Sequence, residues 1–271
     1  MRKHLSTIML VAMFFVGLSV LLYPTISDYW NSKLQSQVIA NYDTMVDEMN
    51  VEDYSRYLEE AKAYNERLSS LPFPMNDYKE AGDYNQILAV GDNDAMGYID
   101  IEKIHVSLPI YHGISKPVLD GAVGHLPGSS FPVGGPSTHA VLSAHRGLPS
   151  AKLFTDLDRL VEGDTFTITV LKEKLTYEID QILIVEPEDM RFLAIDDGKD
   201  YCTLLTCTPY GINSHRLLVR GHRIENANDK TNLVVKNDAI RIDPLVVAPV
   251  VAVPMLLGLL LWMVIRYRRK K

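Results

Sequence analysis

Two long apolar runs, one near each end of the sequence, most constrain how this 271-residue chain folds. The first extends from Leu5 to Tyr23 and the second from Leu245 to Ile265. Both approach the ~20 apolar residues with which an α-helix crosses the hydrocarbon core of a bilayer. Lys and Arg residues stand at the outer end of each run, and short basic flanks stay on the cytoplasmic side of a membrane. We therefore expect a multi-pass membrane protein with two spanning helices, both termini in the cytoplasm and the intervening residues on the extracellular side.

The first apolar run has a second interpretation, as a signal peptide that is removed after export. Residues 25–27 are the nearest candidate for a cleavage site, and they lack a convincing pattern of small residues. The sequence therefore favours residues 1–26 as a retained N-terminal anchor. The second run and the basic residues after it are expected to form a membrane helix and a cytoplasmic tail over 245–271.

The distribution of charge along the sequence bears on whether the protein binds nucleic acid. The formal net charge is −7 although both ends of the sequence are basic, so the segment between the apolar runs is strongly acidic. Such a segment repels polyanions, and a nucleic-acid partner is therefore not expected.

The segment between the apolar runs changes character near Met96. Before it, Ser27 is a candidate N-cap of a helix whose apolar residues recur every three or four positions, and a second helical stripe covers 54–68. Residues 69–94 are rich in Pro, Gly, Asn and Asp, and we expect a long exposed loop there. The expected divisions are a helical extension over 27–70, a loop over 71–95, a β domain over 96–226 and a linker over 227–244.

From Met96 onward, apolar residues alternate with polar ones, which is the period of a β-strand. Residues 151–160 are the stretch that suggests a short helix. Many short strands with few helices between them favour a closed or nearly closed β-barrel over a parallel α/β sheet. The expected strands are 97–101, 106–111, 140–144, 165–171, 175–185, 201–207 and 216–224.

The sequence has two cysteines, Cys202 and Cys207. If both lie on one strand, five steps of about 3.3 Å hold them roughly 16 Å apart, too far for a disulfide. The odd spacing also points the two side chains to opposite faces. A free thiol outside the cell requires an explanation, and Cys207, where an apolar strand ends before Pro209, is a candidate nucleophile. The alternative is a buried, unreactive cysteine.

His145 and Arg216 are the candidate partners of this cysteine, although each alone has an ordinary structural role as the alternative. His145 ends an expected strand, and a Cys–His pair that the fold brings together is a recurrent arrangement for nucleophilic catalysis. Arg216 opens the strand after Cys207, where a fixed guanidinium would stabilise an oxyanion. The competing residues are His139, His215 and His222 for the histidine, and Arg220 for the arginine.

No metal site and no cofactor are expected. The Cys and His residues show no zinc-ligand spacing such as C-x-x-C or H-E-x-x-H. The glycines between positions 121 and 135 fit neither the phosphate-binding loop nor the dinucleotide-binding pattern.

In combination, these residues resemble the sortase family of cysteine transpeptidases. The resemblance covers about 96–224 and rests on Thr-Leu-Leu-Thr-Cys over 203–207, His-Arg-Gly over 145–147 and the arginine at 216. Within the family, the chain is similar to the pilus-assembling class C enzymes, in which a second membrane span near the C-terminus is also found. The segments that carry this closer similarity are 108–111, 132–135, 144–149, 207–210 and 213–221.

The resemblance implies a mainly β fold: a closed eight-stranded sortase-type barrel with short helices, an N-terminal helical extension and two flanking transmembrane helices. It implies that Cys207 attacks the Thr–Gly carbonyl of an LPXTG-like sorting signal and forms a thioester. His145 would give the leaving amine its proton, and Arg216 would hold the substrate or the oxyanion. The acceptor would be a lysine amine of a pilin subunit, with water as a slow side reaction.

The resemblance also implies that the loop over 71–95 is a lid. In class C sortases an Asp-Pro-aromatic motif ahead of the barrel covers the cysteine. At the matching place this chain has Leu71, Pro72 and Phe73, so the aromatic residue is present and the Asp is not. Asp77 and Tyr78 are candidates for the same role in a shifted register. We expect a lid with Phe73 as its plug, held less firmly than in the family.

Three other functions compete with pilus assembly. A housekeeping sortase would perform the same chemistry and attach surface proteins to peptidoglycan, but the second span and the lid-like loop argue against it. A sortase substrate also ends in an apolar span and a basic tail, but residues 242–246 do not match the LPXTG pattern that must precede that span. A non-catalytic, membrane-anchored binding domain would leave the Cys–His–Arg combination without a role.

Overall fold

The structure is a computed structural model that describes residues 2–90, 94–226 and 258. It divides into two compact units, one comprising Met1–Trp30 with Thr231–Lys271 and the other Asn31–Lys230. The described residues of the first unit are Gly258 and the beginning of helix α1 (Arg2–Glu48). The expected linker over 227–244 and, apart from Gly258, the second apolar run lie outside the described residues.

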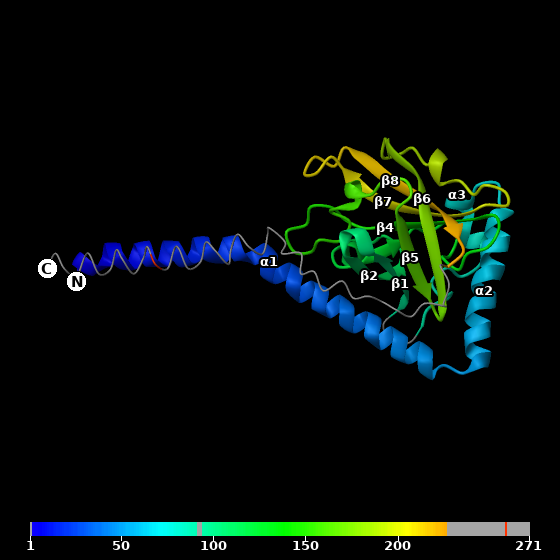
Figure 1. Ribbon diagram of the computed structural model, residues 1–271, viewed down its shortest axis with the longest axis horizontal. Helices are drawn as coiled ribbons and strands as arrows, with labels where there is room; N and C mark the ends of the chain where they lie inside the picture. The colour runs from blue at the N-terminus through cyan, green and yellow to red at the C-terminus, as the bar shows by residue number, and fades with distance from the viewer. Residues whose placement is uncertain (1, 91–93, 227–257, 259–271) are drawn as a thin grey trace. The chain divides into compact units, whose positions relative to one another are not determined.

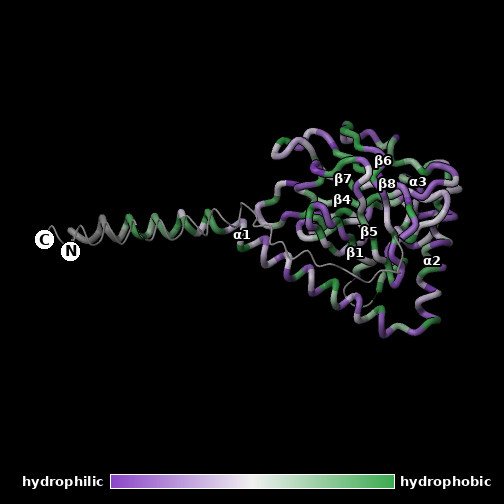
Figure 2. Tube along the Cα trace, viewed as in Figure 1, coloured by the Kyte–Doolittle hydropathy of each residue, from purple (hydrophilic) through white to green (hydrophobic). Residues whose placement is uncertain are grey.

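Helix α1 is the helix in the described part of the chain that is long and apolar enough to cross a bilayer. From Met9 onward, its N-terminal half has many exposed apolar residues, and Figure 2 colours the hydrophobic positions of the helix green. Such a surface suits a membrane anchor. The helix continues through Ser27, so the predicted N-cap at Ser27 is wrong. The apolar run and the amphipathic stripe join without a break, and Pro24 lies inside the helix.

The second unit is built on a closed barrel of eight strands, as expected (Figure 1). Around the barrel the order is β1-β2-β3-β4-β7-β8-β6-β5. The pairs β2/β3 and β4/β7 are parallel, and the other neighbours are antiparallel. The strands are β1 (Ala95–Ile101), β2 (Val106–His112), β3 (Val123–His125), β4 (Thr138–Ser143), β5 (Thr165–Val170), β6 (Glu173–Val185), β7 (Asp200–Thr208) and β8 (His215–Ile224).

Strand β3 is the one that the sequence pattern does not predict. It has three residues and contains Gly124, so it is too short to show alternation. Gly124 is required there because a Cβ atom would lie 2.3 Å from the carbonyl oxygen of Gly113. This close approach lets β3 fit between β2 and β4 and close the barrel.

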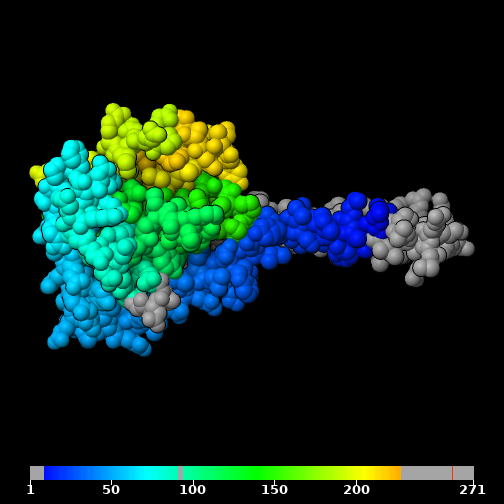
Figure 3. All heavy atoms as spheres, turned by 180° about the vertical axis from the view of Figure 1, so that it is seen from behind, coloured from blue at the N-terminus to red at the C-terminus, as the bar shows by residue number. Residues whose placement is uncertain are grey.

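The helices of the second unit lie outside the barrel. Figure 3 shows the light-blue and cyan residues around α2 packed directly against the green residues of the barrel domain. The side chain of Asn50 caps α2 by accepting a hydrogen bond of 2.8 Å from the backbone N–H of Asp53. The helical segments after α1 are α2 (Val51–Ser69), α3 (Pro74–Asp77), η1 (Tyr78–Ala81), η3 (Glu102–Ile104), α4 (Lys116–Leu119), η4 (Leu157–Arg159) and η5 (Arg191–Leu193).

Two segments differ from the sequence prediction. The segment 69–94, expected as a long exposed loop, contains α3 and η1, and its second half packs into the core through Tyr84, Leu88 and Val90. Residues 151–160, expected as a short helix, form turns and the three-residue helix η4. Apolar side chains decide the conformation in both places, because burying them against the barrel outweighs local propensity.

A buried histidine, His125, packs against two aromatic rings in this core. Its ring stacks on Phe131 at 5.0 Å and on Tyr84 at 5.7 Å between centroids. Its Nε2 donates to the Ser130 carbonyl oxygen at 2.8 Å, and its Nδ1 lies 3.0 Å from the Tyr84 hydroxyl. Burial lowers the pKa of His125 to about 4, because the charged imidazolium loses its hydration there.

The low pKa of His125 predicts that acid destabilises the barrel. Between the ordinary histidine pKa and about 4, the unfolded chain binds a proton that the folded chain does not, so stability falls as the pH falls through this range. The expected loss is about 3 kcal/mol in the free energy of unfolding between pH 7 and pH 4. Urea denaturation followed by circular dichroism at both pH values measures this loss. His125→Gln should lose distinctly less, and an equal loss in both proteins would contradict the assignment.

Candidate active site

Strands β7 and β8 bring Cys207 and Arg216 together. The two residues are direct partners in the antiparallel pairing of these strands. Directly opposed residues of an antiparallel pair project from the same face, with Cβ atoms about 4.5–5.5 Å apart. The thiol and the guanidinium therefore emerge side by side at one end of the barrel.

Strand β4 brings His145 to the same end. It runs parallel to β7, with Ser143 paired to Leu205 as the last register position. The contact continues past the strand end, since the backbone N–H of Ala144 donates to the Leu205 carbonyl oxygen at 3.2 Å. Two residues past the last register pair, along both strands, lie His145 and Cys207. Cys207 and Arg216 thus lie on β7 and β8, and His145 follows the end of the neighbouring strand β4.

The two cysteines lie in opposite environments, as their odd spacing predicts. Cys202 is fully buried inside the barrel, and burial raises the pKa of its thiol well above the ordinary value. Cys207 is partly exposed on the other face of β7. A thiol that stays protonated and inaccessible is a poor nucleophile, so Cys207 is the cysteine that can react with a peptide.

The guanidinium of Arg216 is held by backbone carbonyls. Its Nη1 donates to the carbonyl oxygens of His215 at 3.1 Å and Asn213 at 3.3 Å. Among the residues that the structure describes, no carboxylate lies within ion-pair distance of Arg216. Its positive charge is therefore fixed in position without being neutralised by an acidic side chain.

The rival arginine is already paired. Arg220 makes a two-pronged ion pair with Asp180, at 3.0 Å and 3.1 Å, and lies 4.2 Å above the centre of the Tyr201 ring. It lies four residues farther along β8 than Arg216. A guanidinium that is saturated in this way supports the barrel and has little capacity to bind a substrate.

The rival histidines also have partners of their own. His139 is buried, with Nδ1 2.7 Å from the Ala194 carbonyl oxygen and Nε2 2.7 Å from the Thr203 hydroxyl. Burial lowers the pKa of His139, so it stays neutral inside the fold. Nε2 of His215 lies 3.3 Å from a carboxylate oxygen of Glu186, and Nδ1 of His222 lies 3.9 Å from a carboxylate oxygen of Asp180.

An apolar cluster lies on the same strand faces as Cys207 and Arg216. Leu205 and Leu218 are two residues away from them on β7 and β8 and belong to this cluster. Met75 of helix α3 packs against it. The backbone of Met75 also lies close to Gly128, where an added Cβ atom would approach the Met75 Cα atom to 2.6 Å. The segment ahead of the barrel is therefore seated beside the site through Met75.

The seating of this segment differs from the sequence expectation. Phe73, expected as the plug, is 66% exposed and does not belong to the apolar cluster. Tyr78 instead packs into the main core, with its ring 5.7 Å from that of Tyr84. Asp77 makes no ion pair with Arg216 in the described structure. The aromatic motif does not point to Met75. No local sequence pattern could identify this residue, because it packs against residues of strands that lie far along the chain.

A metal centre has no support in the described part of the chain. No group of three or more His, Cys, Asp or Glu side chains there could hold a metal ion. The chemistry that the described site offers is that of a thiol, an imidazole and a guanidinium.

Comparison with known proteins agrees with this architecture. Residues 99–224 match the family model of the sortase domain. The crystal structure of sortase C1 from Streptococcus agalactiae is 49% identical, covers 70% of this chain and 99% of its own, and has a TM-score of 0.66. The structure of Clostridium perfringens sortase C with the C-terminal cell wall sorting motif is 42% identical, covers 70% and 100%, and has a TM-score of 0.62.

Curated relatives match over shorter lengths. Sortase D of Bacillus subtilis is 30% identical over 133 residues, which are 48% of this chain and 64% of that protein. Sortase A of Streptococcus agalactiae is 31% identical over 116 residues, which are 42% and 47%. The chain thus spans about half to two thirds of the length of these two relatives. With the barrel and the nearly complete coverage of the solved sortase C structures, these matches show that the chain belongs to the sortase family of cysteine transpeptidases and is a sortase of class C.

Proposed function

We propose that this sortase polymerises pilin subunits, with Cys207 as nucleophile, His145 as general acid and base, and Arg216 as the oxyanion or substrate ligand. The observation that carries the proposal is the strand register, which pairs Cys207 with Arg216 and brings the end of β4, two residues before His145, alongside β7. Two structural relatives support the substrate class. One was solved with a cell wall sorting motif, and the structure of a Streptococcus pneumoniae sortase C provides insights into catalysis and pilin substrate specificity.

The reaction proceeds in two acyl transfers. The sulfur of Cys207 attacks the carbonyl carbon between Thr and Gly of an LPXTG-like signal, and Arg216 stabilises the negative charge on the carbonyl oxygen. The C–N bond breaks as His145 gives a proton to the departing amine, which leaves a thioester on Cys207. A lysine amine of another pilin then attacks the thioester, loses a proton to His145 and expels the thiolate. One amide is exchanged for another, so no ATP is consumed.

The membrane topology is part of the proposal. The apolar first part of α1 anchors the chain, and the run over 245–265 forms a second span, so that both termini are cytoplasmic. The domain boundaries expected from the sequence then place the barrel, 96–226, on the extracellular side, where secreted pilins arrive. An external location also makes independence from ATP necessary.

Mass spectrometry of the full-length chain in detergent tests the proposed reaction. The protein is mixed with an LPXTG peptide, and either a lysine-bearing pilin segment or a peptidoglycan stem peptide is supplied as the acceptor. We expect an acyl adduct on Cys207 that passes to the lysine. Transfer to the peptidoglycan amine alone would favour the housekeeping alternative, and no adduct would contradict transpeptidation of this signal.

We also propose that the segment around α3 acts as a lid that competes with the substrate, because Met75 packs against the apolar cluster that includes Leu218, two residues from Arg216 on β8. Met75→Ser removes this contact, whose burial stabilises the seated segment by roughly 1–2 kcal/mol. The rate of peptide acylation should therefore rise by up to about tenfold. The control is Phe73→Ser, since Phe73 is exposed and its loss should leave the rate unchanged. If Phe73→Ser raised the acylation rate and Met75→Ser left it unchanged, Phe73 and not Met75 would be the residue that blocks the site.

A further inference from the structure

Arg146 follows His145 directly and has no role in the reaction described above. It lies in the loop that leaves β4 for η4, and its side chain is only 9% exposed. A guanidinium is rarely buried to this extent without a specific reason, because its charge loses hydration. The contacts of Arg146 indicate what that reason is.

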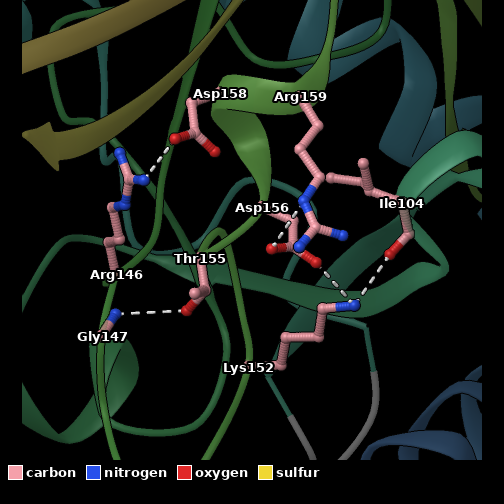
Figure 4. A network of polar contacts seen from close by, with 8 residues as sticks. All are labelled: Ile104, Arg146, Gly147, Lys152, Thr155, Asp156, Asp158 and Arg159. Carbon is pink, nitrogen blue, oxygen red and sulfur yellow. Dashed lines mark hydrogen bonds and ion pairs between the residues drawn. The ribbon is translucent and has the colours of Figure 1, made fainter. Parts of the chain in front are cut away.

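Two terminal nitrogens of Arg146 reach in different directions. Nη2 forms an ion pair with Asp158 of η4 at 2.5 Å, which Figure 4 shows. Nη1 makes a long hydrogen bond of 3.5 Å to the hydroxyl of Thr208, the residue that follows Cys207. The guanidinium also lies 5.9 Å from the centre of the Tyr210 ring in the loop after β7. One side chain thus joins the loop that carries His145 to the loop that follows Cys207.

Both ends of this connection are firmly placed. Asp158 lies in η4, whose neighbouring residue Leu157 is fully buried in the core. Gly147, the residue after Arg146, packs so closely on Tyr210 that an added Cβ atom would approach its ring carbon to 3.0 Å. The backbone N–H of Gly147 also donates to the Thr155 hydroxyl at 3.1 Å, as Figure 4 shows. The connection therefore fixes the backbone on both sides of the His145–Cys207 pair.

Fold stability alone does not explain this arrangement. Nε of Arg146 is buried without a hydrogen-bond partner among the residues that the structure describes. A buried donor without a partner costs free energy. An ion pair whose carboxylate is half exposed, as that of Asp158 is, contributes little to stability. Local arrangements that are unfavourable for folding are concentrated at functional sites.

We propose that Arg146 is a positioning residue, which holds the His145 loop against the residue after Cys207 so that imidazole and thiol meet in reacting geometry. The inference rests on the proposed roles of Cys207 and His145. Because Arg146 does not touch the substrate in this proposal, its loss should impair the chemical steps and leave binding intact. Arg146→Gln should lower kcat for peptide acylation about 10- to 100-fold with KM within about twofold of the wild-type value.

Variants of the same loop sharpen the test. Arg146→Lys keeps the charge but cannot span Asp158 and Thr208 with a planar fork, so it should recover less than half of the lost kcat. Asp158→Ala removes the anchor of Arg146 and should lower kcat in the same direction. The double variant should then be no slower than Arg146→Gln alone, because both changes break one connection. The matched control is Arg159→Gln, which breaks the neighbouring ion pair with Asp156 and should leave kcat and KM unchanged.

The measurements use the full chain in detergent, with folding checked by circular dichroism melting. If Arg146→Gln does not fold, Asp158→Ala decides, because that carboxylate is half exposed and its removal leaves the core intact. Wild-type kcat in Asp158→Ala and in any folded Arg146 variant, or a change in KM alone, would overturn the inference. A wild-type protein that forms no adduct on Cys207 would instead contradict the proposed function, so the two failures are distinguishable.

Discussion

We expect Cys207→Ala to abolish formation of the acyl adduct with a sorting-signal peptide and Cys202→Ala to retain it. The two cysteines lie on one strand, and the structure gives them opposite surroundings. Cys207 is partly exposed beside Arg216, while Cys202 is enclosed by the barrel. Because the reaction passes through a thioester, loss of the nucleophile removes the pathway, and the rate should fall at least about 10³-fold.

The paired substitution separates chemistry from folding. Cys202→Ala leaves a small cavity in the core and should lower the free energy of unfolding by roughly 1–2 kcal/mol. Cys207→Ala should leave stability nearly unchanged, since its side chain is not part of the core. Adduct mass and thermal melting, measured on the same two proteins, give both results. An adduct that persists in Cys207→Ala and disappears in Cys202→Ala would exchange their roles and contradict the assignment.

The sequence predicts the barrel strands well where alternation is long. The expected strands 165–171 and 175–185 correspond to β5 and β6 within two residues at each end. Their side chains alternate between core and surface over many positions, so the period alone identifies them. The order of strands around the barrel could not be predicted in this way. The β4–β7 pairing, for example, joins residues about sixty positions apart, and no local pattern indicates it.

The candidate site shows the same division between local and long-range information. Cys207, His145 and Arg216 stand out because each lies at a strand end next to turn residues, which is visible in the sequence. That they belong to adjacent strands follows only from closure of the barrel. Met75 does not stand out in the sequence, because its position comes from packing against a cluster of Val141, Val185, Leu193 and Leu218, all more than sixty residues away. The family resemblance points to Phe73, an aromatic residue that the structure leaves exposed.

Arg216→Gln should lower kcat/KM for peptide acylation by about 10²–10³-fold, the usual effect of removing one donor to a developing oxyanion. Arg216 is the cross-strand partner of Cys207, and two backbone carbonyls hold its guanidinium, so its charge is in place before the substrate arrives. Arg216→Lys keeps the charge without the rigid fork and should recover only part of the loss. The reaction is followed by the release of the glycine-bearing product at several peptide concentrations.

Arg220→Gln is the control that distinguishes a catalytic loss from a general effect of losing an arginine on β8. It leaves Asp180 partly buried without its partner, so the free energy of unfolding should fall by about 1–3 kcal/mol. Its kcat/KM should stay near the wild-type value at a temperature where the protein is folded, because Arg220 is saturated by Asp180 and Tyr201. If Arg220→Gln lost most of its kcat/KM while Arg216→Gln kept a value near that of the wild type, Arg220 would be the residue that stabilises the oxyanion. The geometry of β8 argues against that outcome, because Asp180 already neutralises the charge of Arg220, whereas the charge of Arg216 is held only by backbone carbonyls.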